Sequence, residues 1–300
     1  MDYSNKIVEE INNAARMKPG YVIRTAEEII PLMDVDAYSN KILDIAYANE
    51  TEAEKLDIFF PTDRKENMPV LIEVHGSGWY FGQKRSVEFE PFLAGLKRGF
   101  ICVSLGYTLS PAAHYPQPVL EIKSAIRYLR RNASKYGIDP DRMVLWGGSA
   151  GAHLAALAAM SCDTGYLQRD LNGDCEYSAK PNVLALWYGC FAMEKMKDIW
   201  MAHNFMGMED FSKSEEDIRL ANPINHITDQ ACPVFMQHGT ADRIVDYTQS
   251  TAFYKRLQET TGRKTDILEL LDGYDHADAR MFLEENINKV YDFAENTFSC

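Results

Sequence analysis

The chain has 300 residues, of which 46% are hydrophobic and 25% are charged, and these values suit one large globular domain with a substantial core. The formal net charge of −13 and the lack of a Lys/Arg cluster argue against nucleic acid and anionic membrane surfaces as partners. The N-terminus has no basic stretch followed by an apolar one, and no run is long enough to span a membrane, so we expect a cytoplasmic protein.

Residues 1–40 are expected to form an N-terminal segment of this single domain, with helical stretches at residues 7–17 and 26–33. Such a segment could cap a site that the rest of the chain forms. Beyond it, short apolar runs alternate with amphipathic helical patterns, without internal repeats or low-complexity tracts. This alternation predicts an α/β fold in which a mostly parallel, twisted sheet carries helices on both faces.

The predicted elements mark the core of this fold. One helix face carries Val119, Ile122, Ile126 and Leu129, and a later one carries Leu283, Ile287, Val290 and Ala294. The predicted parallel strands are residues 70–74, 100–105, 143–145, 183–188, 233–237 and 266–271.

The strand at residues 70–74 runs into the loop His75-Gly76-Ser77-Gly78-Trp79. Gly76 and Gly78 allow this loop to bend so that its backbone N–H groups point inward, as an oxyanion formed in acyl transfer requires. A tight turn between a strand and a helix is the alternative reading. His75 is interpreted as a structural side chain that braces the loop.

The strand at residues 143–145 leads into Trp146-Gly147-Gly148-Ser149-Ala150-Gly151, which opens an Ala/Leu-rich helix. A Gly-x-Ser-x-Gly pattern between a strand and a helix is typical of a nucleophile elbow, in which a sharp and strained turn exposes the serine. Gly147 and Gly151 leave room for the strand and the helix to cross closely. The amide of Ala150 would be the second donor to the oxyanion.

Two further strands end in the remaining residue types of a serine hydrolase. Asp242 follows the strand at residues 233–237, and His276 follows the strand at residues 266–271. A serine hydroxyl needs an imidazole as base, and the imidazole needs a carboxylate that fixes its tautomer. Because parallel strands end at one edge of the sheet, Ser149, Asp242 and His276 are expected to converge there.

With these motifs, the chain resembles the α/β-hydrolases of the esterase/lipase superfamily, and it is most similar to the acetyl-esterase and feruloyl-esterase-like branch that acts on acylated carbohydrates. The resemblance extends over residues 44–295. The stretches that carry it are residues 56–61, 75–79, 107–111, 136–142, 147–153, 223–227 and 238–245.

Two positions depart from the pattern of that family. The usual HGGG-type loop reads His-Gly-Ser-Gly here, so a side chain at Ser77 is expected where the anion would approach. Asp246 replaces the usual proline and supplies a second candidate acid near Asp242. We expect Asp242 to be the acid, because Asp246 would lie near the start of the following helix.

Residues 190–222 interrupt the alternation after a strand and are rich in Met and aromatic residues. In the fold that the chain resembles, an insertion at this place commonly covers the acyl pocket, so this segment is a candidate lid. An ordinary helical hairpin packed on the core explains the pattern equally well.

The remaining chemistry-bearing residues are interpreted as structural. His153, His226 and His238 are expected to be packed and hydrogen-bonded, and Asp275 and Asp278 to be solvated. The six cysteines show no metal-binding spacing and are expected to be free thiols; a disulfide between Cys162 and Cys175 would need an oxidising compartment. No metal or phosphate-binding motif is found, so neither a metal nor a cofactor is expected.

The resemblance and the motifs together predict serine-dependent hydrolysis of short acyl or hydroxycinnamoyl esters, such as those of plant-wall oligosaccharides. Ser149 would be the nucleophile, His276 the base and Asp242 its partner, with Gly76, Ser77, Gly78 and Ala150 forming the oxyanion hole. Trp79, Tyr80, Tyr188 and Trp200 could stack on a sugar or an aromatic acyl group.

Other functions remain open at this point. An amidase of the arylformamidase type would use the same residues. A lipase, a peptidase or a non-catalytic binding protein fits the sequence less well, and the sequence leaves the formation of a homo-oligomer open.

Overall fold

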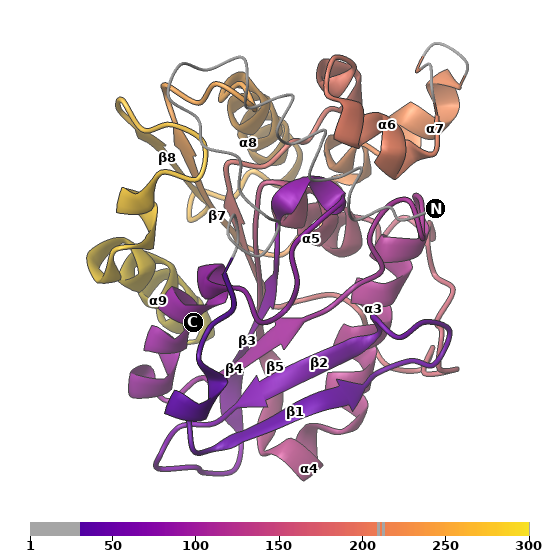
Figure 1. Cartoon of the computed structure of the whole chain (residues 1–300). Coiled ribbons are helices and arrows are strands. Elements are labelled where there is room, and N and C mark those ends of the chain that lie inside the picture. The colour runs from indigo at the N-terminus through magenta and orange to yellow at the C-terminus, as the bar shows by residue number, and fades with distance from the viewer. Residues whose placement is uncertain (1–30, 209–210, 212–213, 300) are drawn as a thin grey trace.

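The computed structural model describes residues 31–208, 211 and 214–299. Within these residues the chain folds around an eight-stranded sheet with the strand order β1-β2-β4-β3-β5-β6-β7-β8. Helices α3 and α9 lie on opposite sides of the strands, so the sheet forms the middle of three layers (Figure 1). This arrangement confirms the predicted α/β fold.

All six predicted strands are present, and they pair in parallel with one another in the order β4-β3-β5-β6-β7-β8. Most of their side chains are buried because helices cover both faces, which explains why they read as continuous apolar runs. The strands are β3 (Met68–Val74), β4 (Ile101–Leu105), β5 (Ile138–Gly148), β6 (Val183–Trp187), β7 (Val234–Gly239) and β8 (Ile267–Leu271).

Two antiparallel strands at one edge of the sheet were not among the predicted elements. Strand β1 (Lys41–Ala46) pairs with β2 (Lys55–Phe59), and β2 pairs with β4. The side chains of β1 alternate between half-buried and exposed, as at an edge that contacts the core with one face only. The buried Asp57 on β2 is neutralised by Lys84 and Arg85, at 2.8 Å and 2.6 Å.

One face of the sheet is covered by α3 (Gln117–Arg131), α4 (Ala133–Tyr136), α5 (Ala150–Met160) and α8 (Thr248–Thr261). The predicted apolar face of α3 is fully buried in this layer. Every residue of α5 is also buried, because this helix lies between the sheet and α3. The small Ala residues of α5 allow this close approach on both sides.

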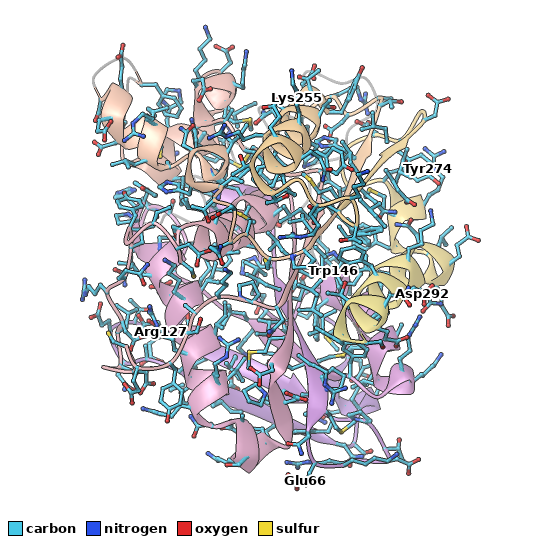
Figure 2. The ribbon with its side chains drawn as sticks, turned by 180° about the vertical axis from the view of Figure 1, so that it is seen from behind. Glu66, Arg127, Trp146, Lys255, Tyr274 and Asp292 are labelled. Atoms are coloured by element: carbon cyan, nitrogen blue, oxygen red, sulfur yellow. The ribbon has the colours of Figure 1, made fainter. Side chains whose placement is uncertain are left out.

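The other face is covered by η3 (Val87–Arg98) and α9 (Glu284–Phe298). Ile287, Val290 and Ala294 of α9 are buried, as predicted, but Leu283 precedes the helix and is 51% exposed. Its predicted place in the core was therefore wrong. Trp146 lies at the centre of the molecule, whereas Lys255, Tyr274 and Asp292 lie at its surface (Figure 2).

The described residues between 190 and 222 form an excursion of several short helices between β6 and β7. Helices α6 and α7 lie together at the end of the molecule away from β1 and β2 (Figure 1). Phe191, Met193 and Phe205 are buried, so much of the apolar character of the excursion is used in packing. Its elements are η4 (Met193–Met196), α6 (Trp200–Met206) and α7 (Glu215–Leu220), and η6 (Pro223–His226) follows the segment.

The predicted helix at residues 7–17 and most of the one at residues 26–33 lie outside the described residues. The last residues of the second stretch are extended rather than helical, because Leu32 forms an antiparallel bridge with Ser86 and the Met33 amide donates to the Arg85 carbonyl. Among the described residues, no helix is both long enough and apolar enough to cross a bilayer.

Candidate active site

Ser149 stands at the sharp turn between β5 and α5. Its backbone adopts φ 53° and ψ −122°, a conformation that residues other than glycine rarely adopt. The Ser149 amide donates to the Trp187 carbonyl at 2.9 Å, and the His153 amide donates to the Ser149 carbonyl at 3.1 Å. Strand β6 and the first turn of α5 thus hold the strained serine in place.

Two glycines make this turn possible. A Cβ atom on Gly151 would lie 2.0 Å from the Val74 carbonyl oxygen, and one on Gly147 would lie 2.4 Å from the Gly151 backbone. No side chain fits at either position without moving backbone atoms. The close crossing of β5 and α5 therefore requires both glycines, as the sequence pattern predicted.

The structure brings Ser149, His276 and Asp242 into one hydrogen-bonded chain. The Ser149 Oγ lies 2.9 Å from His276 Nε2, and His276 Nδ1 lies 2.8 Å from Asp242 Oδ2. His276 follows β8 and Asp242 follows β7, so the three residues converge at the carboxyl edge of the parallel strands.

The Asp242 carboxylate has four hydrogen-bond donors. Its Oδ1 accepts from the amides of Ile244 and Val245, both at 2.9 Å, and its Oδ2 faces His276 and His238. Burial alone would raise the pKa of Asp242, but the hydrogen bonds from His238 and His276 hold it well below the usual range. The group is therefore a carboxylate at neutral pH and fixes the His276 ring.

Asp246 lies outside this network, as expected. Its Oδ1 accepts from the Thr248 amide at 2.8 Å, at the start of α8. The structure therefore assigns Asp246 to the helix start and Asp242 to the neighbourhood of His276.

His238 is packed and hydrogen-bonded, as expected, and its hydrogen bonds also connect it to the site. Its Nε2 lies 3.0 Å from Asp242 Oδ2 and 2.9 Å from the Val245 carbonyl, and its Nδ1 lies 2.7 Å from Ser250 Oγ. Since both partners of Nε2 are acceptors, Nε2 carries the proton and Nδ1 accepts from Ser250. In the sequence, the four-residue spacing from His238 to Asp242 was the available indication of this contact.

The loop after β3 lies against the elbow. Ser77, Gly78 and Trp79 have φ values of 66°, 64° and 57°, and a Cβ atom on Gly76 would come within 3.4 Å of Ser149 Cβ. The amides of Ser77, Gly78 and Ala150 donate no hydrogen bond to the described part of the chain, and all three residues border the cavity in front of Ser149.

The Ser77 side chain does not lie where the sequence suggested. Its Oγ is beside Gly82, where a Cβ atom would come within 3.1 Å of it and 3.0 Å of His75 Nδ1. The left-handed backbone at Ser77 turns the side chain away from the approach to Ser149. The Ser77 hydroxyl therefore lies beside Gly82 and His75, and the expectation that it would stand in the path of the anion is corrected.

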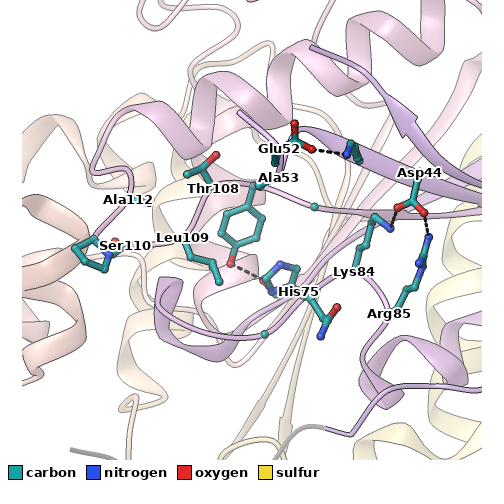
Figure 3. A pocket seen from close by; sticks show the side chains of 16 residues that line it. Asp44, Glu52, Ala53, His75, Lys84, Arg85, Thr108, Leu109, Ser110 and Ala112 are labelled. Carbon is teal, nitrogen blue, oxygen red and sulfur yellow. Dashed lines mark hydrogen bonds and ion pairs between the residues drawn. The ribbon is translucent and has the colours of Figure 1, made fainter. Parts of the chain in front are cut away.

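His75 braces the loop from behind, next to a second cavity of about 670 Å³ (Figure 3). Its ring stacks on Tyr107 at 4.4 Å between centroids, and the Tyr107 hydroxyl donates to the His75 carbonyl at 3.0 Å. Burial lowers the pKa of His75 to about 4, so the ring is neutral at physiological pH.

The cavity in front of Ser149 has a volume of about 400 Å³. Met196, Ile199 and Met201 from the excursion form one wall, together with Ile244 and Val245. This wall is apolar, and it shows that residues 190–222 shape the space around the serine.

The four aromatic residues expected to bind substrate divide into two pairs. Trp79 and Tyr188 line the cavity, and the Tyr188 ring contacts His276 at 4.9 Å between centroids. Tyr80 and Trp200 do not line it and instead pack edge-to-face against each other at 4.8 Å. A stacking role for Tyr80 and Trp200 in this cavity is therefore not supported by their positions.

Two carboxyl groups in the cavity wall were not anticipated. Glu73 on β3 and Glu88 on η3 both line the space in front of Ser149. Glu88 belongs to none of the recognised motifs, and for Glu73 the available signal was an acidic residue inside an otherwise apolar strand, just before the oxyanion loop.

The other residues interpreted as structural are partnered. His153 accepts from the Trp79 indole at 3.2 Å and lies 2.8 Å from the Ala221 carbonyl, while His226 lies 2.8 Å from the Leu220 carbonyl. Asp275 and Asp278 are bound by arginines rather than merely solvated, and Arg243 lowers the pKa of Asp275 to about 2.

The described cysteines, Cys102, Cys162, Cys175, Cys190 and Cys232, are free. Within residues 31–208, 211 and 214–299, no three His, Cys, Asp or Glu side chains are grouped in a way that could hold a metal ion.

Comparison with known proteins places this geometry in context. Residues 56–257 match the family model BD-FAE. The esterase LipQ of Mycobacterium tuberculosis is 32% identical over 240 residues, which are 78% of this chain and 56% of LipQ. Kynurenine formamidase from Salmo salar is 26% identical over 242 residues, covering 78% of this chain and 74% of that protein.

Among solved structures, a truncated form of a carbohydrate esterase from gut microbiota superposes with a TM-score of 0.77. The two are 23% identical, and the match covers 90% of this chain and 100% of that one, so it shows a shared fold. The chain spans little more than half the length of several curated relatives that it matches.

Proposed function

Because the chain belongs to the BD-FAE family and has the α/β-hydrolase fold, we propose that it hydrolyses carboxylic esters with Ser149 as nucleophile. One observation carries this proposal: an unbroken hydrogen-bonded chain runs from Asp242 through His276 to a serine on a strained elbow. A packed structural serine would need neither this strain nor a cavity in front of it.

In the first step, Ser149 Oγ attacks the carbonyl carbon of the ester while His276 Nε2 takes its proton. Asp242 accepts the hydrogen bond from His276 Nδ1 and stabilises the positive charge that forms on the imidazole. The carbonyl oxygen becomes an oxyanion, for which the unused amides of Ser77 or Gly78 and of Ala150 are the donors.

Collapse of this intermediate expels the alcohol, which takes the proton from His276, and leaves an acyl group on Ser149. Water then attacks the acyl-enzyme with His276 again acting as base, and the acid is released. No metal or cofactor takes part in this scheme, since His276 carries each proton and Asp242 stabilises the charge that forms on it.

For the substrate, we propose short acyl or hydroxycinnamoyl esters of carbohydrates. The resemblance to acetyl- and feruloyl-esterase-like enzymes supports this choice, as does the limited space of about 400 Å³. The esterase LipQ supports ester hydrolysis in general. The carbohydrate esterase of similar fold adds nothing on substrate, because the two chains are only 23% identical.

A formamidase is the second candidate, because kynurenine formamidase is among the relatives. The same residues would attack an aryl formamide, with the arylamine leaving in place of the alcohol. Turnover of N-formylanilines compared with phenyl and 4-nitrophenyl esters separates the two activities.

The decisive experiment replaces the proposed nucleophile. Ser149→Ala should lower kcat for 4-nitrophenyl acetate by about 10⁴-fold or more, since the three residues act as a unit. A fluorophosphonate probe should label the wild type and not the variant, while the circular dichroism spectrum and Tm stay close to those of the wild type. Labelling that persists in Ser149→Ala would overturn the assignment.

A further inference from the structure

The cavity in front of Ser149 has walls of different chemistry. Methionine and aliphatic side chains form the wall on the side of residues 190–222, whereas Glu73 and Glu88 lie on the side of η3. Phe92, Phe282 and Tyr188 also line the cavity. Neither glutamate belongs to the proposed catalytic residues.

Glu73 is a buried carboxyl with an unused oxygen. The side chain is 4% exposed, and its one hydrogen bond within the described chain is a long one, from Ser104 Oγ to Oε2 at 3.4 Å. Oε1 accepts nothing from the described residues although it belongs to a residue that lines the cavity. A polar atom at the wall of a cavity is stabilised when a ligand or water in that cavity forms a hydrogen bond with it.

Other buried carboxylates in this protein have partners of their own. Asp57 is paired with Lys84 and Arg85, and Glu121 accepts from the Thr108 amide at 2.6 Å. Glu88, in contrast, forms no hydrogen bond or ion pair with the described residues. Within the described chain, the two carboxyls that line the cavity thus lack the strong partners that Asp57 and Glu121 have.

The charge state of this pair favours hydroxyl groups. Burial, together with the neighbouring Glu88, raises the pKa of Glu73 to about 8, so near neutral pH Glu73 is protonated and can both donate and accept. Burial also raises the pKa of Glu88, whose oxygens can accept from a ligand. A hydroxyl, which donates and accepts, matches such a pair, whereas an anionic ligand would be repelled by the ionised form.

We propose that Glu73 and Glu88 form a hydroxyl-binding subsite that makes the enzyme select esters with a hydroxyl group near the scissile bond. This inference rests on the proposed hydrolase function and assigns its specificity to two residues. The apolar wall opposite takes the part of the ester without polar groups, and the rings of Phe92 and Phe282 can cover the C–H face of a polyol or sugar.

The test compares esters that differ only in a hydroxyl group. The substrates are cyclohexyl acetate and the monoacetates of cyclohexane-1,2-, 1,3- and 1,4-diol, with acetate release as the measurement. For at least one diol monoacetate, the wild type should show a kcat/KM at least about tenfold above that for cyclohexyl acetate, as expected for a hydrogen bond to a buried acidic group.

Glu88→Leu should reduce this ratio to about one while cyclohexyl acetate is still hydrolysed. Glu73→Gln should reduce it partially, because an amide keeps one donor and one acceptor. Glu90→Leu is the matched control, since Glu90 lies on the same element but is exposed and does not line the cavity, and it should keep the wild-type ratio. A cooperative unfolding transition well above the assay temperature in every variant excludes unfolding as the cause.

Four results would overturn the inference. Equal kcat/KM values of the wild type for plain and hydroxylated acetates would do so, as would a ratio that survives in Glu88→Leu. Stronger preference for the corresponding aminocyclohexyl acetates would show a cation site in place of a hydroxyl site. Failure to hydrolyse any acetate would overturn the hydrolase assignment and this inference with it, and is recognised by the absence of all activity.

Discussion

At the scale of single residues, the carboxylate that follows β7 shows how one side chain acquires its role. Asp242 and Asp246 are four residues apart, yet only Asp242 reaches His276, because the turn after β7 directs the Ile244 and Val245 amides onto its Oδ1. The sequence offered both carboxylates, and the expected start of the next helix was enough to separate them.

Asp242→Asn should therefore lower kcat by about 10³–10⁴-fold, because an amide favours the wrong tautomer of His276. Asp246→Asn should change kcat less than about threefold and should affect only the start of α8, as Asp246 is not in contact with His276. Steady-state kinetics with 4-nitrophenyl acetate on both variants measure this difference. A larger loss of kcat in Asp246→Asn than in Asp242→Asn would identify Asp246 as the acid that supports His276.

His238 gives a second prediction at this scale. It shares Asp242 Oδ2 with His276, so without its hydrogen bond the Asp242–His276 pair should hold its proton more tightly. His238→Gln should keep most of the activity, because its amide can still donate, whereas His238→Leu should move the acidic limb of the kcat/KM profile upward by up to about one pH unit. Ser250→Ala serves as the control, since it leaves the His238–Asp242 contact in place. An unchanged profile in a folded His238→Leu would show that His238 is only a packing residue.

At the scale of secondary-structure elements, the parallel strands could be predicted because each is a short apolar run that ends in glycine or a polar turn. The antiparallel β1 was not predicted, since an edge strand exposes half of its side chains and has no apolar run. The acidic pair was also missed, because Glu73 and Glu88 meet only through the packing of η3, an irregular segment that contains Pro91.

The excursion after β6 leads to a prediction on chain length. Met201 lines the cavity and lies so close to the oxyanion loop that a Cβ atom on Gly78 would come within 2.2 Å of its sulfur, whereas Trp200 faces Tyr80. Activity should fall from acetyl to octanoyl 4-nitrophenyl esters, at about 0.8 kcal/mol for each methylene that finds no apolar contact.

Met201→Ala should flatten this dependence by opening the wall. Met206→Ala is the matched control on the same helix, because Met206 is buried but does not line the cavity. The kcat/KM values for acetyl, butyryl, hexanoyl and octanoyl esters decide the question. A wild-type preference for octanoyl esters would contradict the short pocket and favour a lipase.

At the scale of the whole molecule, buried ionisable groups set the dependence of stability on pH. The buried carboxyls Glu73 and Glu121 have pKa values raised to about 8 and 7, chiefly by burial, so their contribution to stability is lost as pH rises from the unfolded value of about 4.5 through these values. The buried His75 and His153 have pKa values lowered to about 4, so their contribution is lost as pH falls below about 6.5.

Between about pH 4.5 and 6.5 the two effects oppose each other, and above pH 6.5 only the carboxyls remain. The Tm should therefore fall as pH rises from 6.5 to 8, and Glu73→Gln should make this decline shallower because the amide does not ionise. Thermal unfolding followed by circular dichroism at half-unit pH steps measures the slope. A Tm that rises over this range would contradict the protonated state assigned to Glu73.

The acidic wall also bears on how a turnover ends. Hydrolysis converts a neutral ester into a neutral alcohol and a carboxylate anion, and this anion arises in a cavity that Glu88 also lines, in a chain of formal net charge −13. Repulsion should expel the acid promptly, whereas a hydroxylated alcohol keeps its hydrogen bonds to the wall that selected it. Product inhibition should accordingly come from the alcohol. The inhibition constant for acetate should be at least about tenfold higher than that for cyclohexane-1,2-diol. The acidic wall that selects the substrate would then also limit how fast the alcohol leaves the site.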